Sequence, residues 1–279
     1  MGKQEVTYPG EMGLEYLLND FPKFNNKTVE RILSVDKPMV TVVMLNWLRW
    51  NVFMNTLDHI IERQTIPMNI SMIVQECTGI KKQNMVKEKL KKFSDYTVQF
   101  TKENRGTGPP RHKALHRALD KFDAPYIHFT DDDMRLPRFA VELMVSILED
   151  NPKLGAVNMK THPNSNIWIM NKMNKLQCIK PNLKRMFHKS LALGSATMVV
   201  RREVFETCDI DKKYIIGCAD IDLGMQMTKA GWECAMITIP NWYAINVKGG
   251  ANIYNSTRYD RTIIKESAAR FQRKWGHKL

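Results

Sequence analysis

Three adjacent carboxylates, Asp131, Asp132 and Asp133, directly follow the apolar run YIHFT, which is typical of a buried strand. Adjacent negative charges repel one another unless a cation lies among them. Carboxylate oxygens are preferred ligands of Mg²⁺ and Mn²⁺, and these ions often bridge to phosphate groups. The alternative is a solvated turn in which Asp132 or Asp133 caps the next helix. Because a cap needs only one such side chain, the triplet favours a divalent metal that holds a diphosphate.

A second acidic motif, GCADIDLGMQ, contains Asp220 and Asp222. The pattern predicts a helix from about Ile221, with Asp220 at its N-cap and Asp222 adding favourable charge to its first turn. Simple capping is one interpretation. The other is that Asp220 faces the aspartate triplet across a cleft and accepts a proton from a hydroxyl group, a role that suits a carboxylate within hydrogen-bond reach.

The elements that must position these carboxylates are visible as apolar runs alternating with amphipathic segments. The expected strands cover residues 39–45, 68–76, 96–103 and 125–130, and the expected helices cover 50–64, 80–93, 111–122 and 138–151. This alternation predicts an α/β fold with a Rossmann-like, mostly parallel sheet flanked by helices. Ligands of such sheets bind at the carboxyl ends of the strands. Those ends supply Asn46, Glu76, the ENRGTG loop and the aspartate triplet.

The absence of two phosphate-binding motifs limits the functional classes. Neither GxGxxG nor GxxxxGK[ST] follows the first expected strand, which argues against a dinucleotide dehydrogenase and a P-loop enzyme. The five cysteines form no CxxC pair, so the sequence predicts neither a disulfide framework nor a thiolate zinc site. Without an apolar run of membrane-spanning length or a signal peptide, we expect a cytoplasmic protein, in the host cytoplasm if it is viral. Peripheral contact with a membrane stays open.

The charge of the chain is strongly basic and unevenly distributed. Its 279 residues carry 42 lysines and arginines against 29 acidic residues, a formal net charge of +13. Residues 151–202 contain no Asp or Glu. This distribution indicates a polyanionic partner or an anionic surface, although a merely solvated basic face is the alternative. The candidate polyanion-binding residues are Lys175, Lys180, Lys184, Arg185 and Lys189.

Taken in order, the motifs resemble those of the family 2 glycosyltransferases of the GT-A fold. They are TVVMLNWLRW, MIVQE, NRGTGPPRHKAL, YIHFTDDDMRLP, GSATMVVRREVF, ADIDLGMQMTKAGW and FQRKWG. The resemblance extends over 38–276 and implies an inverting transfer that uses Mn²⁺ or Mg²⁺ and a nucleotide-sugar, usually a UDP-sugar. It also implies a domain organisation. We expect a helical N-terminal extension over 1–37, a GT-A domain with a smaller acceptor-side subdomain over 38–245, and a basic C-terminal segment over 246–279.

The resemblance assigns roles to individual residues. Asp131 and Asp133 match metal ligands, Asp220 matches the catalytic base, and the acceptor or sugar side includes Gly194, Ser195 and Asp222. The positions that match nucleotide-sugar contacts are Asn46, Arg49, Glu76, Asn104, Gly106, Arg111, Asp131 and Asp132. The chain departs from the family pattern at Glu76, His112, Ala219 and Gln226, where the family more often has Asp, Asn, Glu and Arg. The metal-binding histidine expected near INVKGGAN is missing.

Three hypotheses about the function remain open at this point. The acid-free basic stretch lies between the aspartate triplet and Asp220, where the resemblance places the acceptor side of the cleft. Its positive charge favours a hydroxyl on a phosphate-rich polymer, such as hydroxymethylated pyrimidine in DNA, as in bacteriophage DNA modification. The second hypothesis is transfer to a surface glycan or a lipid-linked acceptor at an anionic membrane. The third is a non-catalytic nucleic-acid-binding protein on a decayed GT-A scaffold, which the intact aspartate triplet and Asp220 disfavour.

Overall fold

The computed structural model describes residues 25–63, 65–162, 166–171, 173, 175–182, 184–239, 243–247 and 260–277. Their core is a mixed eight-stranded sheet with the order β10-β12-β6-β11-β4-β1-β2-β3. Its strands are β1 (Val40–Trp47), β2 (Met68–Gln75), β3 (Tyr96–Phe100), β4 (Tyr126–Asp131), β6 (Leu154–Met159), β10 (Phe187–Ser190), β11 (Thr197–Arg201) and β12 (Glu233–Ile237). β1 to β4 are mutually parallel where they pair, as predicted. β11 runs antiparallel between β4 and β6 and so joins the two halves of the sheet.

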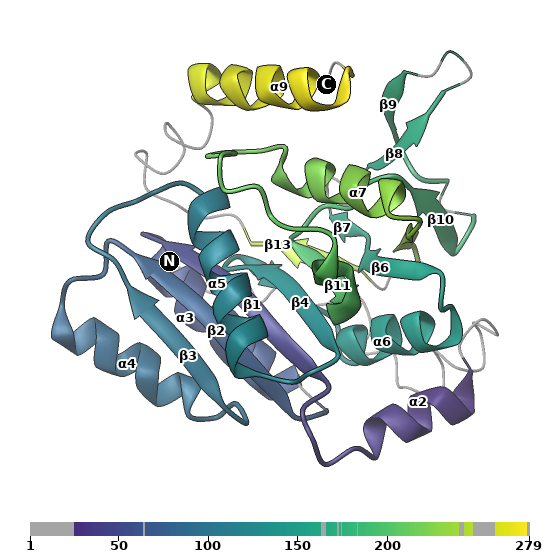
Figure 1. The fold of residues 1–279 in the computed structure, drawn as a ribbon. Coiled ribbons are helices and arrows are strands. Elements are labelled where there is room, and N and C mark those ends of the chain that lie inside the picture. Colours follow the sequence, from purple (N-terminus) through teal and green to yellow (C-terminus); the bar gives the residue numbers. More distant parts are fainter. Residues whose placement is uncertain are drawn as a thin grey trace, which may run out of the picture.

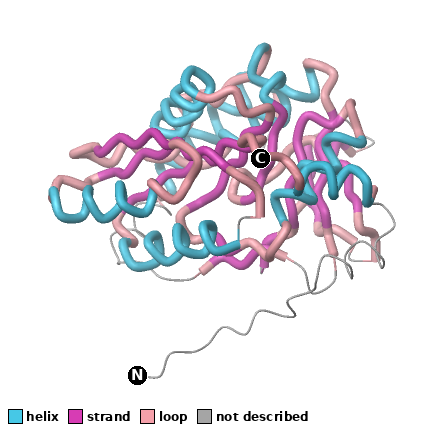
Figure 2. The backbone as a smooth tube through the Cα atoms, turned by 90° about the horizontal axis from the view of Figure 1, so that it is seen from below, coloured by secondary structure: helices cyan, strands magenta, loops and turns pink. Residues whose placement is uncertain are grey.

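Helices cover both faces of this sheet (Figure 1). The first face carries α3 (Trp50–Arg63), α4 (Ile80–Leu90) and α6 (Ala140–Asp150), and the second carries α5 (Gly108–Lys121) and α7 (Ala219–Lys229). Successive residues of β1 point to opposite faces of the sheet. Val42 and Met44 pack in one core cluster, and Val43 and Leu45 pack in the other. Figure 2 shows the strands as a layer between these helices. The predicted α/β layering is therefore confirmed.

The helix before the first strand is packed on the domain. α2 (Asn26–Leu33) buries Val29 and Ile32 completely and lies against α6. Thr28 Oγ1 donates a hydrogen bond to Asp150 Oδ1 at 2.8 Å. Of the predicted N-terminal extension, residues 1–24 lie outside the described residues.

The acid-free stretch folds into short strands that the sequence patterns did not predict. β8 (Ile167–Met170) and β9 (Leu176–Ile179) form an antiparallel hairpin that projects from the domain in Figure 1. A small second sheet combines β5 (Met134–Arg135), β7 (Thr161–His162) and β13 (Ala244–Asn246). Leu176 of the hairpin packs against the apolar cluster of α7 and the C-terminal helix, so the basic hairpin lies beside that end of the domain.

Two arginines of the acid-free stretch hold the fold together. The Arg201 guanidinium donates to the main-chain oxygens of Leu148 and Leu154, and Arg202 donates to those of Leu119 and Phe122. Leu148 and Leu119 lie in the last turns of α6 and α5. Main-chain carbonyl groups in the last turn of a helix have no partner within that helix. This part of the basic charge therefore satisfies buried main-chain groups.

The C-terminal helix, α9 (Arg261–Trp275), lies over α7 (Figure 1). Its Phe271 is completely buried against Tyr214 and Met225. The carboxylate of Asp222, also completely buried, accepts hydrogen bonds from Trp275 Nε1 at 2.7 Å and Lys274 Nζ at 2.8 Å. Asp222 therefore anchors α9 to α7.

Gly224 allows α7 to approach the loop after β10. A Cβ atom at this position would lie 2.3 Å from the Leu191 carbonyl oxygen and 2.5 Å from Ala192 Cα. Glycine normally destabilises a helix interior, so close packing explains its presence here. We expect Gly224→Ala to lower the free energy of unfolding by about 1–3 kcal/mol in a denaturant titration, because main chain must shift. Gly194→Ala, whose Cβ would meet nothing within 4 Å, is the control and should change it little.

None of the helices in the described ranges is long and apolar enough to cross a membrane.

Candidate active site

A cavity of about 390 Å³ opens at the carboxyl ends of β1, β2 and β4, between the first turns of α5 and α7. Nine of the predicted site residues line it: Asn46, Arg49, Asn104, Gly106, Arg111, Asp131, Asp132, Ser195 and Asp220. Leu45 pairs with Asp131 across β1 and β4, so sheet register alone places the end of β1 beside the aspartate triplet. The convergence follows from parallel topology, which brings several strand ends to one edge.

Each aspartate of the triplet has a cationic neighbour. Asp131 Oδ1 accepts a hydrogen bond from Arg111 at 2.6 Å, and Asp133 Oδ2 accepts one from Arg49 at 2.6 Å. Asp132 is bound by Arg49 and by the Asn46 side-chain amide at 2.6 Å. Burial raises the pKa of Asp132 to about 7, although the Arg49 guanidinium opposes this shift. Two arginines thus compensate part of the repulsion that the sequence implies.

The donor set fits an oxygen-seeking divalent cation. The carboxylates of Asp131 and Asp132 line the cavity, and Mg²⁺ or Mn²⁺ takes its remaining ligands from water and phosphate in such sites. Asp133, predicted as a direct ligand, does not line the cavity. It is 1% exposed and lies against the buried Arg49 side chain.

Asp220 lies in the first turn of α7, which begins at Ala219. The predicted N-cap position was wrong, because the residue before the helix is Cys218, with a left-handed φ of 63°. Burial raises the pKa of the Asp220 carboxyl, while nearby Arg111 and main-chain N–H groups, including that of Ser195, limit the rise. A half-buried carboxylate that lines the same cavity as Asp131 and Asp132 can accept a proton from a bound hydroxyl.

Arg111 links the two acidic sides of the cavity. Its guanidinium donates to Asp131 Oδ1 and to Ser195 Oγ, both at 2.6 Å, and its charge acts on Asp220. Arg111 lies in the first turn of α5, where Pro109 and Pro110 precede it. Prolines are tolerated there because first-turn N–H groups have no partner within the helix.

The loop before α5 is shaped by Gln75, the last residue of β2. Gln75 donates to the Gly106 carbonyl at 3.0 Å and accepts from the Arg105 N–H at 2.8 Å. Gly106 has a φ of 77°, and a Cβ there would lie 2.4 Å from the Ile215 carbonyl oxygen. Only glycine satisfies both the left-handed backbone and this close approach.

Several predicted residues do not line the cavity. Glu76 lies at the end of β2, exposed, where it accepts a hydrogen bond from Trp47 Nε1 at 2.8 Å. Gly194 is bound through its carbonyl oxygen to Asn158, and Asp222 is buried under α9. The candidate polyanion-binding residues are exposed on and after the hairpin, and Lys189 pairs with Glu233 at 2.7 Å. The segment that lacks the expected histidine falls mainly outside the described residues.

Other lining residues were missed by sequence reasoning. Trp47 and Gln75 end their strands, so strand-end position was a usable signal for both. Ile264 of α9 also lines the cavity, and no sequence signal connects it with the strand ends.

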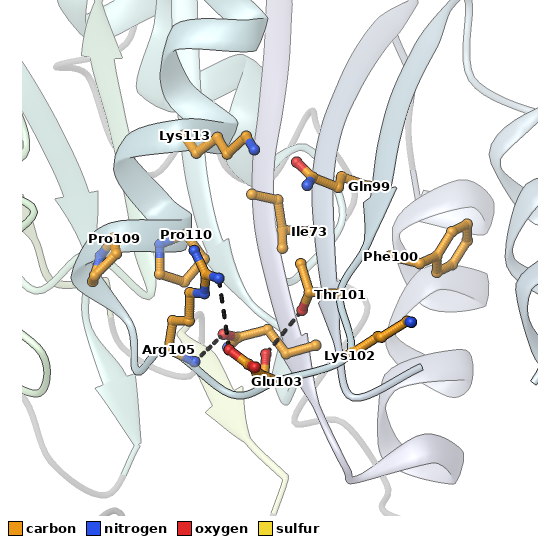
Figure 3. Close-up of a pocket in the computed structure, with 11 residues that line it drawn as sticks. Ile73, Gln99, Phe100, Thr101, Lys102, Glu103, Arg105, Pro109, Pro110 and Lys113 are labelled. Carbon is orange, nitrogen blue, oxygen red and sulfur yellow. Dashed lines mark hydrogen bonds and ion pairs between the residues drawn. The ribbon is translucent and has the colours of Figure 1, made fainter. Parts of the chain in front are cut away.

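A second cavity, of about 460 Å³, lies between β3 and the start of α5 (Figure 3). Lys102, Arg105 and Lys113 surround it, and Glu103, its one lining carboxylate, pairs with Arg105 at 3.6 Å. It shares Gln75 with the first cavity but contains none of the aspartates described above. The three aspartates that suit metal binding and proton transfer, Asp131, Asp132 and Asp220, therefore lie in the first cavity.

Comparison with known proteins decides the family. The family model described as "glycosyltransferase like family 2" matches residues 38–243. The chain belongs to glycosyltransferase family 2. Its enzyme class, glycosyltransferase, and its GT-A fold are as the sequence predicted. No curated protein matches the chain in sequence.

Solved structures with the same fold share little sequence with this glycosyltransferase. A mannosyltransferase from Pyrobaculum calidifontis in complex with GDP-Man and Mn²⁺ has a TM-score of 0.57 at 16% identity, covering 88% of this chain and 70% of that one. GalNAc-T7 with UDP, GalNAc and Mn²⁺ has a TM-score of 0.56 at 13% identity, with coverages of 85% and 53%. The 1–349 fragment of TarS from S. aureus with UDP-GlcNAc has a TM-score of 0.56 at 11% identity, with coverages of 84% and 66%. The chain therefore spans about half of the GalNAc-T7 chain and about two thirds of the 1–349 fragment of TarS.

Proposed function

We propose that this glycosyltransferase moves a sugar, with inversion, from a UDP-sugar to a hydroxyl group on a polyanionic acceptor. The observation that carries the proposal is that Asp131, Asp132 and Asp220 line one cavity, where Arg111 binds Asp131 and its charge acts on Asp220. One side of this cavity suits a cation and a diphosphate, and the other suits proton transfer. The nucleotide-sugars and Mn²⁺ bound by proteins of the same fold support the choice of donor.

The donor nucleotide is assigned to the β1 and β2 side of the cavity. Trp47 offers an aromatic face for the base, and its indole N–H is held by Glu76. Asn46 and Arg49 lie next to the triplet, within reach of a ribose or phosphate bound there. Asp131 and Asp132 would hold Mn²⁺ or Mg²⁺, which supplies Lewis-acid stabilisation of charge on the diphosphate when bound.

Asp220 is assigned the role of general base. Its carboxylate accepts the proton of the acceptor hydroxyl as that oxygen attacks the anomeric carbon, and the bond to the diphosphate oxygen breaks. Arg111 offers positive charge near the departing diphosphate, where electrostatic stabilisation is most effective. One displacement without a protein nucleophile inverts the anomeric configuration.

The favoured acceptor is a hydroxymethylated pyrimidine in DNA. Leu176 of the basic hairpin packs in one cluster with Ala219, which lines the cavity, so the hairpin adjoins the cavity. Arg261 and Lys265 are exposed on α9, close in sequence to the cavity-lining Ile264. Positive charge on two elements beside one cavity suits a phosphate backbone, because contacts with phosphates supply most nonspecific affinity for nucleic acid.

A surface glycan or lipid-linked acceptor is the second candidate. Ile80 and Met85 of α4 are exposed large apolar residues in a helix that also carries Lys81, Lys82 and Lys87. Apolar and basic groups together suit an anionic membrane surface. This helix lies on the other face of the sheet from α5 and α7, so the observation concerns membrane contact and not the cavity itself.

The test is release of nucleoside diphosphate from UDP-sugars with Mn²⁺, using hydroxymethylated duplex DNA, unmodified DNA and glycans as acceptors. We expect release that requires the modified DNA. The variant Lys175→Glu/Arg185→Glu should raise KM for this DNA by at least about 10-fold and weaken its salt dependence, because phosphate contacts are lost. Lys81→Glu/Lys92→Glu, a double reversal at two exposed lysines in and just after α4, is the matched charge control and should change KM little. Release with glycan or lipid acceptors alone would contradict the DNA assignment.

A further inference from the structure

Three potential metal ligands outside the active-site cavity converge on the surface of α5. His112 and His116 are four residues apart, so they share one face of the helix. Their imidazole rings lie 4.2 Å apart between centroids. Asp209, from the segment between the 3-10 helix η1 (Arg202–Glu206) and α7, faces both rings. Among the residues that the structure describes, this is the one group of three or more such side chains close enough to share an ion.

The spacing of the ligand atoms suits a first-row transition metal. His112 Nε2 lies 3.1 Å from Asp209 Oδ2, and His116 Nε2 lies 3.1 Å from both carboxylate oxygens. All three ligand atoms lie within 4.8 Å of one another. In a tetrahedral zinc site with bonds of about 2.0–2.1 Å, ligand atoms are roughly 3.3 Å apart. Small side-chain movements would therefore bring the three atoms to bonding distance.

Hydrogen bonds fix both the main chain and the carboxylate of Asp209. Gln226 of α7 accepts a hydrogen bond from the Asp209 N–H at 3.0 Å and donates one to the Asp209 carbonyl at 2.9 Å. The Ile210 N–H donates to Asp209 Oδ1 at 2.7 Å. Gln226 therefore fixes the main chain of Asp209 beside the two histidines.

We propose that His112, His116 and Asp209 form a binding site for Zn²⁺ or a similar borderline divalent ion, with water in the remaining position. Paired histidines one helical turn apart are an established way to bind zinc. The side chains are accessible, since His112 is 26% exposed and His116 is 45% exposed. A bound ion would join α5 to the segment that leads to Ile216 and Gly217 on the cavity wall, and through Gln226 to α7.

The chemistry of the ligands separates this site from the active-site cavity. Imidazole nitrogens suit Zn²⁺ and Co²⁺, whereas the oxygen-only set of Asp131 and Asp132 suits Mg²⁺ and Mn²⁺. The proposal is therefore independent of whether the cavity binds a nucleotide-sugar. It predicts that Co²⁺ and Mn²⁺ occupy different places in the same protein.

The experiment is calorimetric titration of the metal-free full-length protein with Zn²⁺, together with visible absorption of its Co²⁺ complex. We expect one site that is kept in the presence of excess Mg²⁺, an absorption band typical of nitrogen-ligated Co²⁺, and a rise in Tm with Zn²⁺. His112→Ala and His116→Ala should each weaken Zn²⁺ binding by at least about 10-fold, since even loss of indirect ligand partners has that effect. Asp209→Asn should do the same while keeping an acceptor for the Ile210 N–H.

The control variant is His277→Ala, which removes a histidine that follows α9 and lies outside the cluster. It should bind Zn²⁺ like the wild type. Zn²⁺ binding that survives in the His112→Ala/His116→Ala double variant, or no binding by the wild type, would overturn the proposal. The Tm of each metal-free variant shows whether it is folded, and the three single variants provide separate routes to the same conclusion.

Discussion

Asp220→Asn should reduce the rate of sugar transfer by about 10²–10⁴-fold, the range typical of removing a general base. The amide cannot accept the hydroxyl proton, but it keeps the shape of the carboxylate and the space around it. Nucleotide binding should therefore change little. Steady-state kinetics together with calorimetric titration of the donor nucleotide separate the two effects. A variant that transfers sugar within a few-fold of the wild type would show that Asp220 is not the base.

The same residue should contribute to the acidic side of the pH profile, together with Asp132, whose pKa burial raises to about 7. Burial raises the pKa of Asp220, so the carboxyl should become protonated at a higher pH than an ordinary aspartate. As the pH is lowered, the activity should therefore begin to fall before the usual pKa range of an aspartate is reached. The stability should change with pH in the opposite direction to the activity. A carboxyl whose pKa is raised by folding lowers stability as pH rises through that window, because the folded state holds the proton more tightly. Asp220→Asn should therefore have a higher Tm than the wild type at pH 8, and the difference should shrink at lower pH.

Arg49→Met should destabilise the protein by about 3–5 kcal/mol at pH 8, the cost of leaving buried charge without its partner. The Arg49 side chain is 5% exposed and contacts both Asp132 and Asp133. Without the guanidinium, burial and mutual repulsion would raise the pKa of Asp132 beyond its present value of about 7. The folded state would then hold protons more tightly, so the loss of stability should be largest at high pH and smaller at pH 5. Urea unfolding at the two pH values measures it.

Arg105→Met is the matched control for this prediction. Its ion pair with Glu103 is exposed on both sides, at 70% and 74%, and exposed pairs contribute about 0–1 kcal/mol. The control should therefore unfold within roughly 0.5 kcal/mol of the wild type. Equal effects of Arg49→Met and Arg105→Met would contradict the view that the triplet depends on a buried guanidinium.

The fold was predictable where local patterns and topology agree. The apolar runs that became β1, β2, β3 and β4 are parallel strands because amphipathic helices separate them, and their ends meet at the cavity as expected. Asn46, Arg111 and Asp220, which are far apart in sequence, all line one cavity for that reason. The family resemblance added the roles, which the periodicity of apolar residues does not supply.

The parts that sequence reasoning missed depend on long-range contacts. Asp222 sits two residues beyond Asp220, but its partners Lys274 and Trp275 come from the last helix, which no local signal connects to α7. Arg201 and Arg202 looked like part of a basic surface, yet they bind main-chain carbonyls. The strands β8, β9 and β10 are only four residues each, too short for a reliable alternation of apolar and polar residues.

The central claim is that the cavity between Asp131 and Asp220 binds a nucleoside diphosphate together with a divalent metal. Calorimetric titration of UDP and GDP into the wild type and Asp131→Asn, each with and without Mn²⁺, tests it most directly. We predict one site for UDP in the wild type, tight only with Mn²⁺, and a large loss of affinity in Asp131→Asn. Binding that is equally tight without metal and in the variant, or no binding of either nucleotide, would contradict the proposed site.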